Sequence, residues 1–386
     1  MLTEKHLDFC TSQQQREVVM AVIELGSNTS AAKSLGKDRR TVDRMINRVK
    51  RNAEVSGYSP EHDMTRTAPA GYVVKGVSTF YGKEGTPVNQ WLKVDRDAKR
   101  FAEEMKSAIL AACEDLPKEK PVSAPKNCDE DLLNCFIITD YHLGMLSWGE
   151  ETGADWDTDI AEEMLVKWFA SAIKAAPKAK RAVFAQLGDL LHYDSMESVT
   201  PSSGHLLDSD TRRQKLVRAA IRVLRRCVSL LRKSHQQVHI IMAEGNHDMD
   251  SSIWLREIFH TLHEDDKSVT VDLSPDPYYC LEHGAVSLFF HHGHKRKPEQ
   301  VDKVFTAKFR DVFGRTQKSY AHMGHLHHAK ALESSLMIVE QHRTLAAPDA
   351  YATRGGWLSG RDAKVITYHK KHGEVFRLTI NPEMLK

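Results

Sequence analysis

Carboxylate, amide and imidazole side chains recur in five short clusters along the second half of the sequence. The clusters are Asp140-Tyr141-His142, Gly188-Asp189, Gly245-Asn246-His247-Asp248, His291-His292-Gly293-His294 and Gly324-His325-Leu326-His327. Oxygen and imidazole donors together suit Mn, Fe or Zn better than Ca or soft copper. A bound metal ion polarises a substrate oxygen and lowers the pKa of water, so the clusters point to metal-assisted hydrolysis.

Each cluster lies at the end of a short segment of strand length. The first four segments are LLNCFIIT, RAVFAQL, VHIIMA and VSLFF, and Lys318-Ser319-Tyr320 precedes the fifth cluster. Amphipathic helices predicted at about 158–174 and 210–233 separate the first three segments. A strand–helix–strand order implies crossover connections and a largely buried sheet. Loops at the carboxyl ends of such strands gather at one edge, so we expect the five clusters to converge.

The order of these motifs, DxH, GD, GNHD, HGH and GHxH, resembles that of the calcineurin-like metallophosphoesterases from about residue 133 to at least 328. The resemblance implies an α/β fold, a four-layer sandwich of two sheets flanked by helices. It also implies a dinuclear-metal-dependent phosphoesterase. Within the family, the motifs are most similar to those of SbcD-type DNA-repair nucleases and phage-encoded members.

The resemblance also implies a ligand set for two divalent metal ions. One ion is expected to bind Asp140, His142 and His327, and the other Asn246, His292 and His325, with Asp189 bridging both. A shared carboxylate holds two such cations at roughly 3.5–4 Å, so that each polarises one phosphate oxygen. We expect Mn²⁺, with Fe, Zn, Mg or Ni as alternatives.

His247 matches the family histidine that is not a metal ligand. By resemblance it lies over the phosphate, stabilises charge and protonates the leaving alkoxide. An ordinary loop histidine is the alternative. Asp248, next in the chain, either orients His247 or ends the loop.

Two adjacent histidines, His291 and His292, compete for one ligand position. The register of the HGH motif selects His292, and a one-residue shift would exchange the two. His294, His322 and His328 are expected to support the ligands through hydrogen bonds or to lie on the surface.

The string GDLLH places His192 three residues after Asp189. Phosphoprotein phosphatases of the family carry Asp at that position, so the substitution argues against a protein phosphatase. The string is similar to the GDLFH element of the DNA-repair nucleases, which implies a catalytic role for His192 at DNA ends. A residue at a helix start, supporting the site from outside, is the alternative.

The N-terminal segment is predicted to form three short helices, at 13–25, 29–35 and about 40–52, in the manner of a helix-turn-helix unit. Basic residues are concentrated between positions 37 and 51; they are Lys37, Arg39, Arg40, Arg44, Arg48, Lys50 and Arg51. Such a helix suits contacts with DNA phosphates and entry into the major groove. A docking module with a solvated basic face is the alternative.

Further basic and aromatic groups lie near the motifs along the chain. Arg212, Arg213 and Lys215 close a long connection, where they are expected either to contact a polynucleotide backbone or to lie at a solvated helix start. Lys295-Arg296-Lys297 follows the HGH motif. Near the C-terminus, Arg354-Gly355-Gly356-Trp357 combines a charge with an aromatic face that suits base stacking, although a buried tryptophan would look the same in the sequence. These features favour DNA as the substrate.

The composition leaves three functional hypotheses open. The net charge is only +2, so binding of nucleic acid must depend on local patches. Scattered cysteines and the lack of a signal peptide or membrane span indicate a soluble, cytoplasmic protein. The hypotheses are a DNA nuclease, a phosphomonoesterase acting on a phosphoprotein or small molecule, and a DNA-binding regulator with a scaffold phosphoesterase domain. Related nucleases are dimers, so a homodimer is a further expectation.

The sequence divides into three predicted segments. Residues 1–55 form the helix-turn-helix-like domain, residues 56–131 an intermediate segment and linker, and residues 132–386 the metallophosphoesterase domain. The second boundary follows PKEKPVSAPKNCDED, which is rich in Pro and charge and lacks periodicity.

Overall fold

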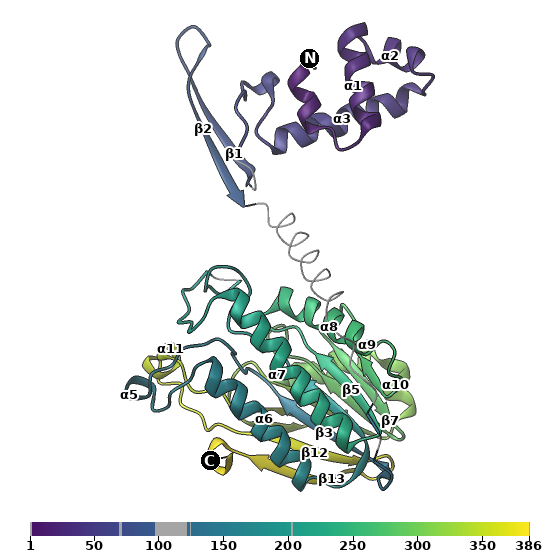
Figure 1. The fold of residues 1–386 in the computed structure, drawn as a ribbon, viewed down its shortest axis with the longest axis vertical. Coiled ribbons are helices and arrows are strands. Elements are labelled where there is room, and N and C mark those ends of the chain that lie inside the picture. The colour runs from purple at the N-terminus through teal and green to yellow at the C-terminus, as the bar shows by residue number, and fades with distance from the viewer. Residues whose placement is uncertain (1, 69–71, 97–121, 124, 202–203, 386) are drawn as a thin grey trace. The chain divides into compact units, whose positions relative to one another are not determined.

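The computed structural model describes residues 2–68, 72–96, 122–123, 125–201 and 204–385 (Figure 1). Its chain separates into two compact units, Met1–Ala108 and Ile109–Lys386. Much of the predicted intermediate segment, residues 97–121, lies outside the described residues. Among the described residues, no helix has the length and apolar character needed to cross a membrane.

The first unit consists of short helices followed by a β-hairpin. The three predicted helices are present, and Ser12 begins the first by accepting a hydrogen bond from the Gln15 amide at 3.3 Å. Their apolar faces bury Val19, Ile46 and Val49 in a small core. The elements are η1 (Glu4–Phe9), α1 (Gln13–Leu25), α2 (Asn28–Ser34), α3 (Arg39–Val55), η2 (Pro60–His62), β1 (Tyr72–Tyr81) and β2 (Pro87–Arg96).

The second unit contains two mixed sheets that pack against each other. The six-stranded sheet has the order β13-β12-β3-β4-β5-β6 and the five-stranded sheet the order β10-β11-β9-β8-β7. The strands are β3 (Asp129–Ile138), β4 (Ala179–Gln186), β5 (Gln237–Met242), β6 (Val269–Val271), β7 (Tyr279–His283), β8 (Val286–Phe290), β9 (Lys318–Met323), β10 (Lys330–Glu333), β11 (Ile338–Gln341), β12 (Ala363–His369) and β13 (Gly373–Ile380).

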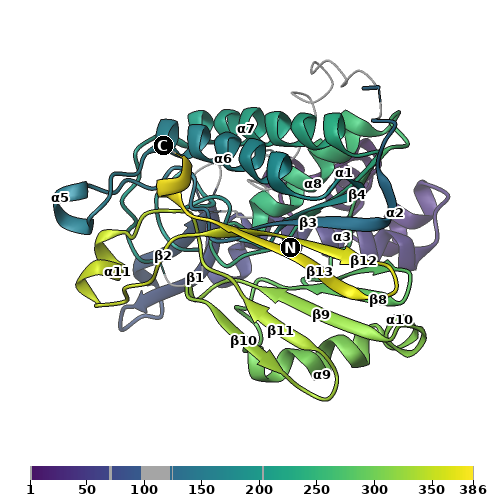
Figure 2. The ribbon, with the colours of Figure 1, turned by 90° about the horizontal axis from the view of Figure 1, so that it is seen from below.

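Helices cover the outer face of each sheet, which gives four layers (Figures 1 and 2). Helices α6, α7 and α8 pack on the six-stranded sheet, and α9 packs on the five-stranded sheet. The predicted helices at 158–174 and 210–233 correspond to α6 and α7. The helices are α5 (Gly149–Thr152), α6 (Thr158–Ala175), α7 (Arg213–Ser234), α8 (Met249–His263), α9 (Pro298–Lys308), α10 (Arg310–Arg315), α11 (Ala350–Arg354) and η3 (Pro382–Leu385).

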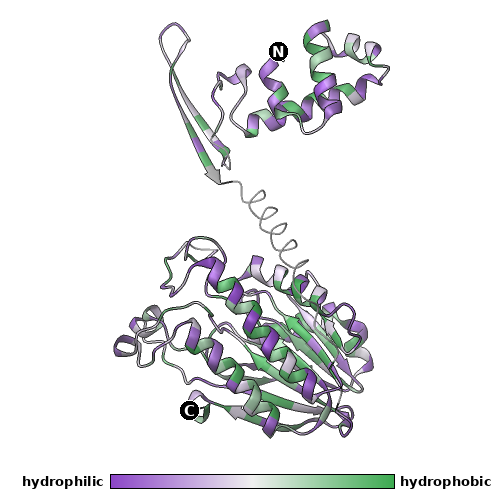
Figure 3. Ribbon diagram, viewed as in Figure 1, coloured by the Kyte–Doolittle hydropathy of each residue, from purple (hydrophilic) through white to green (hydrophobic). Residues whose placement is uncertain are grey.

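Strand β3 shows why the sequence specifies this sandwich. Successive strand residues point to opposite faces, so Phe136 and Ile138 pack under the helices while Cys135 and Ile137 pack against the second sheet. Both faces are therefore apolar. Strands of the second unit are accordingly coloured largely green, for hydrophobic residues, in Figure 3. Burying each large apolar side chain stabilises the fold by about 1.5–3 kcal/mol. The predicted four-layer sandwich is confirmed.

The strand directions bring the five clusters to one edge. Strands β3, β4 and β5 are parallel neighbours, and β8 and β9 form a parallel pair in the other sheet. Their carboxyl ends therefore deliver the loops that carry the carboxylates, amide and imidazoles. This is the convergence that the strand–helix–strand order predicted.

Candidate metal centre

Asp140, His142 and His327 form the first group of converging ligand atoms. One donor atom from each lies within 4.8 Å of the other two. His327 Nε2 is 3.2 Å from Asp140 Oδ1 and 3.4 Å from His142 Nε2. Asp140 is fully buried, whereas the His327 side chain is 39% exposed, so solvent reaches the group from the His327 side.

Asp189, His292 and His325 form the second group, again within 4.8 Å. His292 Nε2 lies 3.1 Å from Asp189 Oδ2 and 3.1 Å from Asn246 Oδ1, so the predicted amide ligand joins this group. His292 Nδ1 donates to the Leu187 carbonyl at 2.9 Å, so Nε2 is the nitrogen that the neutral ring would offer to a metal.

The two groups share one site. Asp140 Oδ1 of the first group is 3.9 Å from His292 Nε2 of the second. All seven residues expected to bind metal are thus brought together.

Strained backbone aims many of these side chains. Positive φ angles occur at Asp140, His142, Asp189, His325 and His327, and elsewhere among the described non-glycine residues only at Asp63. Such conformations cost of order 1–3 kcal/mol each and persist where the surrounding structure imposes them. The fold therefore gives up stability at these positions, which indicates a functional constraint.

Glycines next to the ligands leave room for the ligands themselves. A Cβ at Gly245 would lie 2.1 Å from Asp189 Oδ1, and one at Gly324 would lie 2.5 Å from Asp140 Oδ2. The space beside these two glycines is therefore taken by carboxylates of the chain.

The electrostatics of the site suit cations. Burial raises the pKa of a carboxyl group, but His327 and His292 outweigh burial and hold the pKa of Asp140 below its ordinary value. Burial likewise raises the pKa of Asp189, but His292 outweighs burial and lowers this pKa well below its ordinary value. Burial lowers the pKa of His142 well below its ordinary value, and the neighbouring His247 lowers it further. Two carboxylates thus face the neutral ring of His142, while Asp189 and Asp140 outweigh burial and raise the pKa values of His292 and His327.

This donor set fits divalent metal ions. Carboxylate and amide oxygens combine with imidazole nitrogens, the combination that Mn²⁺, Fe²⁺ and Zn²⁺ accept. Asp140 Oδ1 is buried and has no hydrogen bond of acceptable geometry among the described residues. A carboxylate oxygen left in that state is costly unless a cation binds it.

His192 and His247 lie beside the first group. His192 Nδ1 is 3.4 Å from His142 Nδ1, and the rings of His142 and His247 are 4.8 Å apart. Burial, with a further contribution from His247, lowers the pKa of His192 to about 3, so its ring is neutral at pH 7. His247 is only partly buried, and its amide donates to Asp189 Oδ1 at 2.7 Å.

Asp248 braces two of the ligand loops. Its buried carboxylate accepts hydrogen bonds from the amides of Asp189, Leu190 and Leu191 in one loop and of Gly245 in the other, at 2.7–3.2 Å. The sequence left two roles open for Asp248. These contacts show a third, since Asp248 fixes the loop that carries Asp189.

The structure distinguishes the two adjacent histidines, His291 and His292. His291 turns away from the site, donates through Nδ1 to the Pro277 carbonyl at 2.9 Å and stacks on Tyr278. His294 lies near the second group, 3.5 Å from Glu244, and His328 is exposed with Nδ1 on the Leu326 carbonyl.

His322 belongs to a separate buried cluster with Glu340 and His342. Glu340 already accepts Lys364 at 2.6 Å and Arg377 at 2.7 Å, so two cations neutralise it. This cluster braces β9, β11, β12 and β13 rather than offering free ligands. The sequence did not reveal it, because Glu340 and His342 follow no recognisable motif.

The predicted basic groups differ in their exposure to solvent. Arg213 is buried, donates to the Tyr193 carbonyl and pairs with Asp194 at 3.3 Å, so the expectation that it contacts a polynucleotide is wrong. Lys295, Arg296 and Lys297 are exposed directly after His294.

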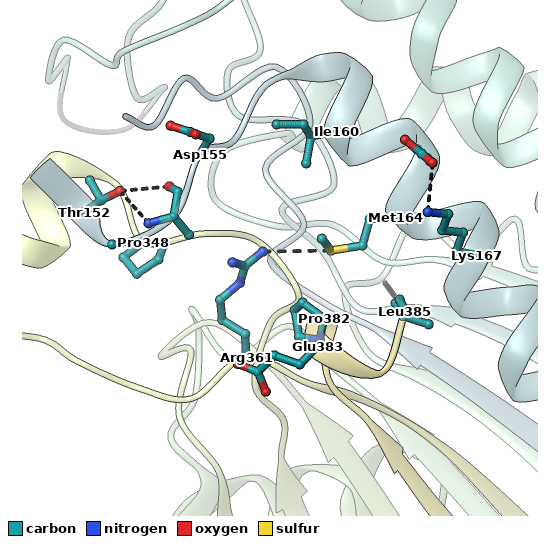
Figure 4. A pocket seen from close by; sticks show the side chains of 13 residues that line it. Thr152, Asp155, Ile160, Met164, Lys167, Pro348, Arg361, Pro382, Glu383 and Leu385 are labelled. Carbon is teal, nitrogen blue, oxygen red and sulfur yellow. Dashed lines mark hydrogen bonds and ion pairs between the residues drawn. The ribbon is translucent and has the colours of Figure 1, made fainter. Parts of the chain in front are cut away.

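A cavity of about 520 Å³ lies between α5, α6 and the C-terminal η3 (Figure 4). Its described lining residues include none of the metal-site groups. Lys167 is paired with Glu163 at 2.9 Å, and Arg361 donates to the Leu345 carbonyl. Its main charged groups are thus engaged within the protein.

Comparisons with known proteins find structural similarity only. No protein-family model matches the sequence, and no curated protein matches it. A predicted phosphoesterase from Streptococcus pneumoniae is 10% identical, with 65% of this chain and 99% of that chain covered and a TM-score of 0.27. A novel archaeal phosphodiesterase is 12% identical (64% and 99% covered, TM-score 0.33), and a 5'-nucleotidase precursor from Thermus thermophilus is 11% identical (66% and 55% covered, TM-score 0.34). The proposed function therefore rests on the site's own geometry.

Proposed function

We propose that this protein is a dinuclear-metal-dependent phosphodiesterase that hydrolyses DNA. The observation that carries the proposal is the pair of ligand groups, each within 4.8 Å, joined by the 3.9 Å approach of Asp140 Oδ1 to His292 Nε2. Two divalent ions bound there, Mn²⁺ by preference, would polarise phosphoryl oxygens and lower the pKa of a water molecule.

His247 is the proposed proton donor to the leaving group. Its Nδ1 donates to the His192 carbonyl at 2.8 Å, which fixes the ring orientation. Nε2 is then the atom that would hold the second proton of the imidazolium ring and deliver it to the departing oxygen. A positioned general acid of this kind contributes about 10²–10⁴-fold to the rate.

The first unit supports DNA as the substrate. Arg39, Arg40, Arg44, Arg48 and Arg51 are all exposed on α3. Within the described part of the chain, Arg39 alone among these five forms an ion pair, with Asp43 at 3.8 Å. A row of exposed guanidinium groups along one helix suits the spacing of backbone phosphates.

Hydrolysis of defined phosphate esters tests the activity. Purified protein with Mn²⁺ is expected to cleave linear DNA and a simple phosphodiester, with nitrophenyl phosphate turned over far more slowly. EDTA should abolish all activity. Turnover of the monoester alone would overturn the proposal in favour of a phosphomonoesterase, and no turnover of any ester would favour the regulator.

Salt dependence tests the role of α3. A double variant, Arg44→Ala with Arg48→Ala, is expected to bind DNA more weakly and to reduce the salt slope by about two. Arg16→Ala, which removes an exposed arginine from α1, is the matched control. Equal binding by wild type and double variant would refute DNA binding by this helix.

A further inference from the structure

Two exposed aromatic rings lie together in the segment that contains and follows α11. Tyr351 is 73% exposed and Trp357 is 60% exposed. Their ring centroids are 5.0 Å apart with an interplanar angle of 51°. Large aromatic rings this exposed leave much apolar surface in water, and a paired arrangement suits a flat ligand.

The local sequence holds this pair in place. Asp349 starts α11 by accepting the Ala352 amide at 2.7 Å, and Gly356 follows its end with φ of 72°. The Trp357 amide then donates to the Ala352 carbonyl at 3.0 Å, the closing bond of a Schellman turn. A Cβ at Gly355 would lie 2.8 Å from the indole, so the ring packs on bare backbone. One side of the indole is supported while much of the ring stays exposed.

The pair is tethered to the metal site. Ser359 donates its hydroxyl to the main-chain carbonyl of His327, a member of the first ligand group. Trp357 precedes Ser359 by two residues, so their Cα atoms are at most about 7.6 Å apart. Arg354 also anchors the segment to Glu151 at 2.7 Å. The rings are therefore only a few residues along the chain from a direct contact with the first ligand group.

The rim of the site carries charge that suits a polyanion. Lys295, Arg296 and Lys297 follow the second ligand group and are exposed, with no ion pair to any residue in the described ranges. Leu326, between His325 and His327, is 50% exposed and adds apolar surface at the rim. Cations beside a metal centre and aromatic rings tethered to it together form the pattern that binds single-stranded nucleic acid.

We propose that Tyr351 and Trp357 stack on an unpaired base next to the scissile phosphate, so that the substrate is single-stranded DNA or a frayed DNA end. This inference rests on the proposed phosphodiesterase function. Bases in a duplex are stacked on one another and cannot reach the rings, whereas an unpaired base exposes its face. Stacking of this kind stabilises binding at any base, so little sequence preference is expected.

Fluorescence of 2-aminopurine in a single-stranded oligonucleotide tests the contact without catalysis. Stacking quenches this base, and the measurement is made in EDTA, so that activity does not contribute. Trp357→Ala is expected to lose the quenching and to weaken the quenched complex about tenfold, whereas Trp357→Phe keeps most of it. Leu358→Ala, which truncates a 76% exposed neighbour without a ring, should match wild type.

Cleavage of two single-stranded oligonucleotides, one with and one without the base beside the scissile phosphate, separates this inference from the proposed function. Trp357→Ala should lower kcat/KM about tenfold on single-stranded DNA and leave it unchanged when the base beside the scissile phosphate is absent. Equal losses on both substrates, or quenching that survives Trp357→Ala, would overturn the stacking role. If wild type cleaves no phosphodiester, the proposed function fails, and the quenching experiment still decides whether the rings bind a base.

Discussion

Nδ1 of His247 donates a hydrogen bond to the main-chain carbonyl of His192 at 2.8 Å. A carbonyl oxygen can only accept, so Nδ1 carries a proton, and a proton delivered by Nε2 must be the second proton of the ring. The GDLLH and GNHD motifs are thus coupled through the backbone as well as through the stacked rings of His192 and His247, whose centroids are 5.9 Å apart. A side-chain substitution at position 192 leaves this bond available.

The first prediction concerns His247. His247→Gln should lower kcat on DNA by about 10²–10⁴-fold, because the proposed proton donor is lost. Metal content, measured by inductively coupled plasma mass spectrometry, should stay at the wild-type value. A leaving group that needs no proton, such as nitrophenolate, should show a much smaller loss. Loss of metal in this variant would instead make His247 a ligand.

The second prediction separates the His192 ring from its carbonyl. His192→Ala keeps the acceptor for His247 but removes the ring that lies 3.4 Å from His142. We expect DNA cleavage to fall at least about tenfold. Wild-type activity in His192→Ala would exclude the catalytic role and leave the ring as packing.

The third prediction concerns Asp189, a member of the second ligand group and the residue expected to bridge both ions. Asp189→Asn removes a negative charge within 3.1 Å of His292 Nε2, so bound metal should fall to about one ion per chain or fewer. Activity should fall with it by at least about 10²-fold. Asp194→Asn offers a comparison outside the ligand groups, since Asp194 pairs with Arg213. Two retained ions in Asp189→Asn would refute the shared site.

The fourth prediction concerns the loop bracing by Asp248. Asn at this position keeps one carbonyl oxygen, but its NH₂ group faces amides that need an acceptor. Asp248→Asn should therefore lower the free energy of unfolding by about 1–3 kcal/mol and weaken metal binding. The exposed neighbour Asp250 gives the control, and Asp250→Asn should change stability little. Chemical denaturation with and without Mn²⁺ measures both effects.

Much of the site could be predicted from the sequence because its elements are local. A motif behind an apolar strand needs only the parallel order of β3, β4 and β5 to reach the common edge. The choice between His291 and His292 was harder, since it depends on stacking with Tyr278 and on the Pro277 carbonyl. The family register selected His292, and the structure likewise places His292 beside Asp189.

Features that depend on distant partners could not be predicted. The sequence indicates a surface cation at Arg213, because only the folded chain brings Asp194 and Ser251 into contact with its guanidinium group. The four amides bound by Asp248 come from two loops, and Glu340 meets Lys364 and Arg377 only after β11, β12 and β13 have packed. Positive φ at the ligands likewise follows from the assembled loops, because Asp and His at those positions have no local preference strong enough to impose it.

The last prediction uses His235, which is buried far from the metal site along the chain. Its Nδ1 donates to the Leu231 carbonyl and Nε2 accepts from Asn134, both at 3.1 Å. Burial lowers the pKa of His235 to about 4, against an ordinary value of 6.5. The folded protein therefore resists protonation that the unfolded chain accepts, so His235 favours folding above pH 6.5 and this contribution is lost as the pH falls toward 4.

The resulting slope can be measured. His235 should contribute about 1.4 kcal/mol per pH unit to the fall in the free energy of unfolding between pH 6.5 and 4. His235→Gln keeps groups that can bond to Leu231 and Asn134 but cannot titrate. The free energy of unfolding of this variant should therefore fall less steeply with pH over this range, and the difference in slope should correspond to about one bound proton. Exposed His205 supplies the control, and His205→Gln should keep the wild-type slope. Equal slopes for His235→Gln and wild type, measured by urea denaturation in EDTA, would show that His235 titrates alike in the folded and unfolded chains.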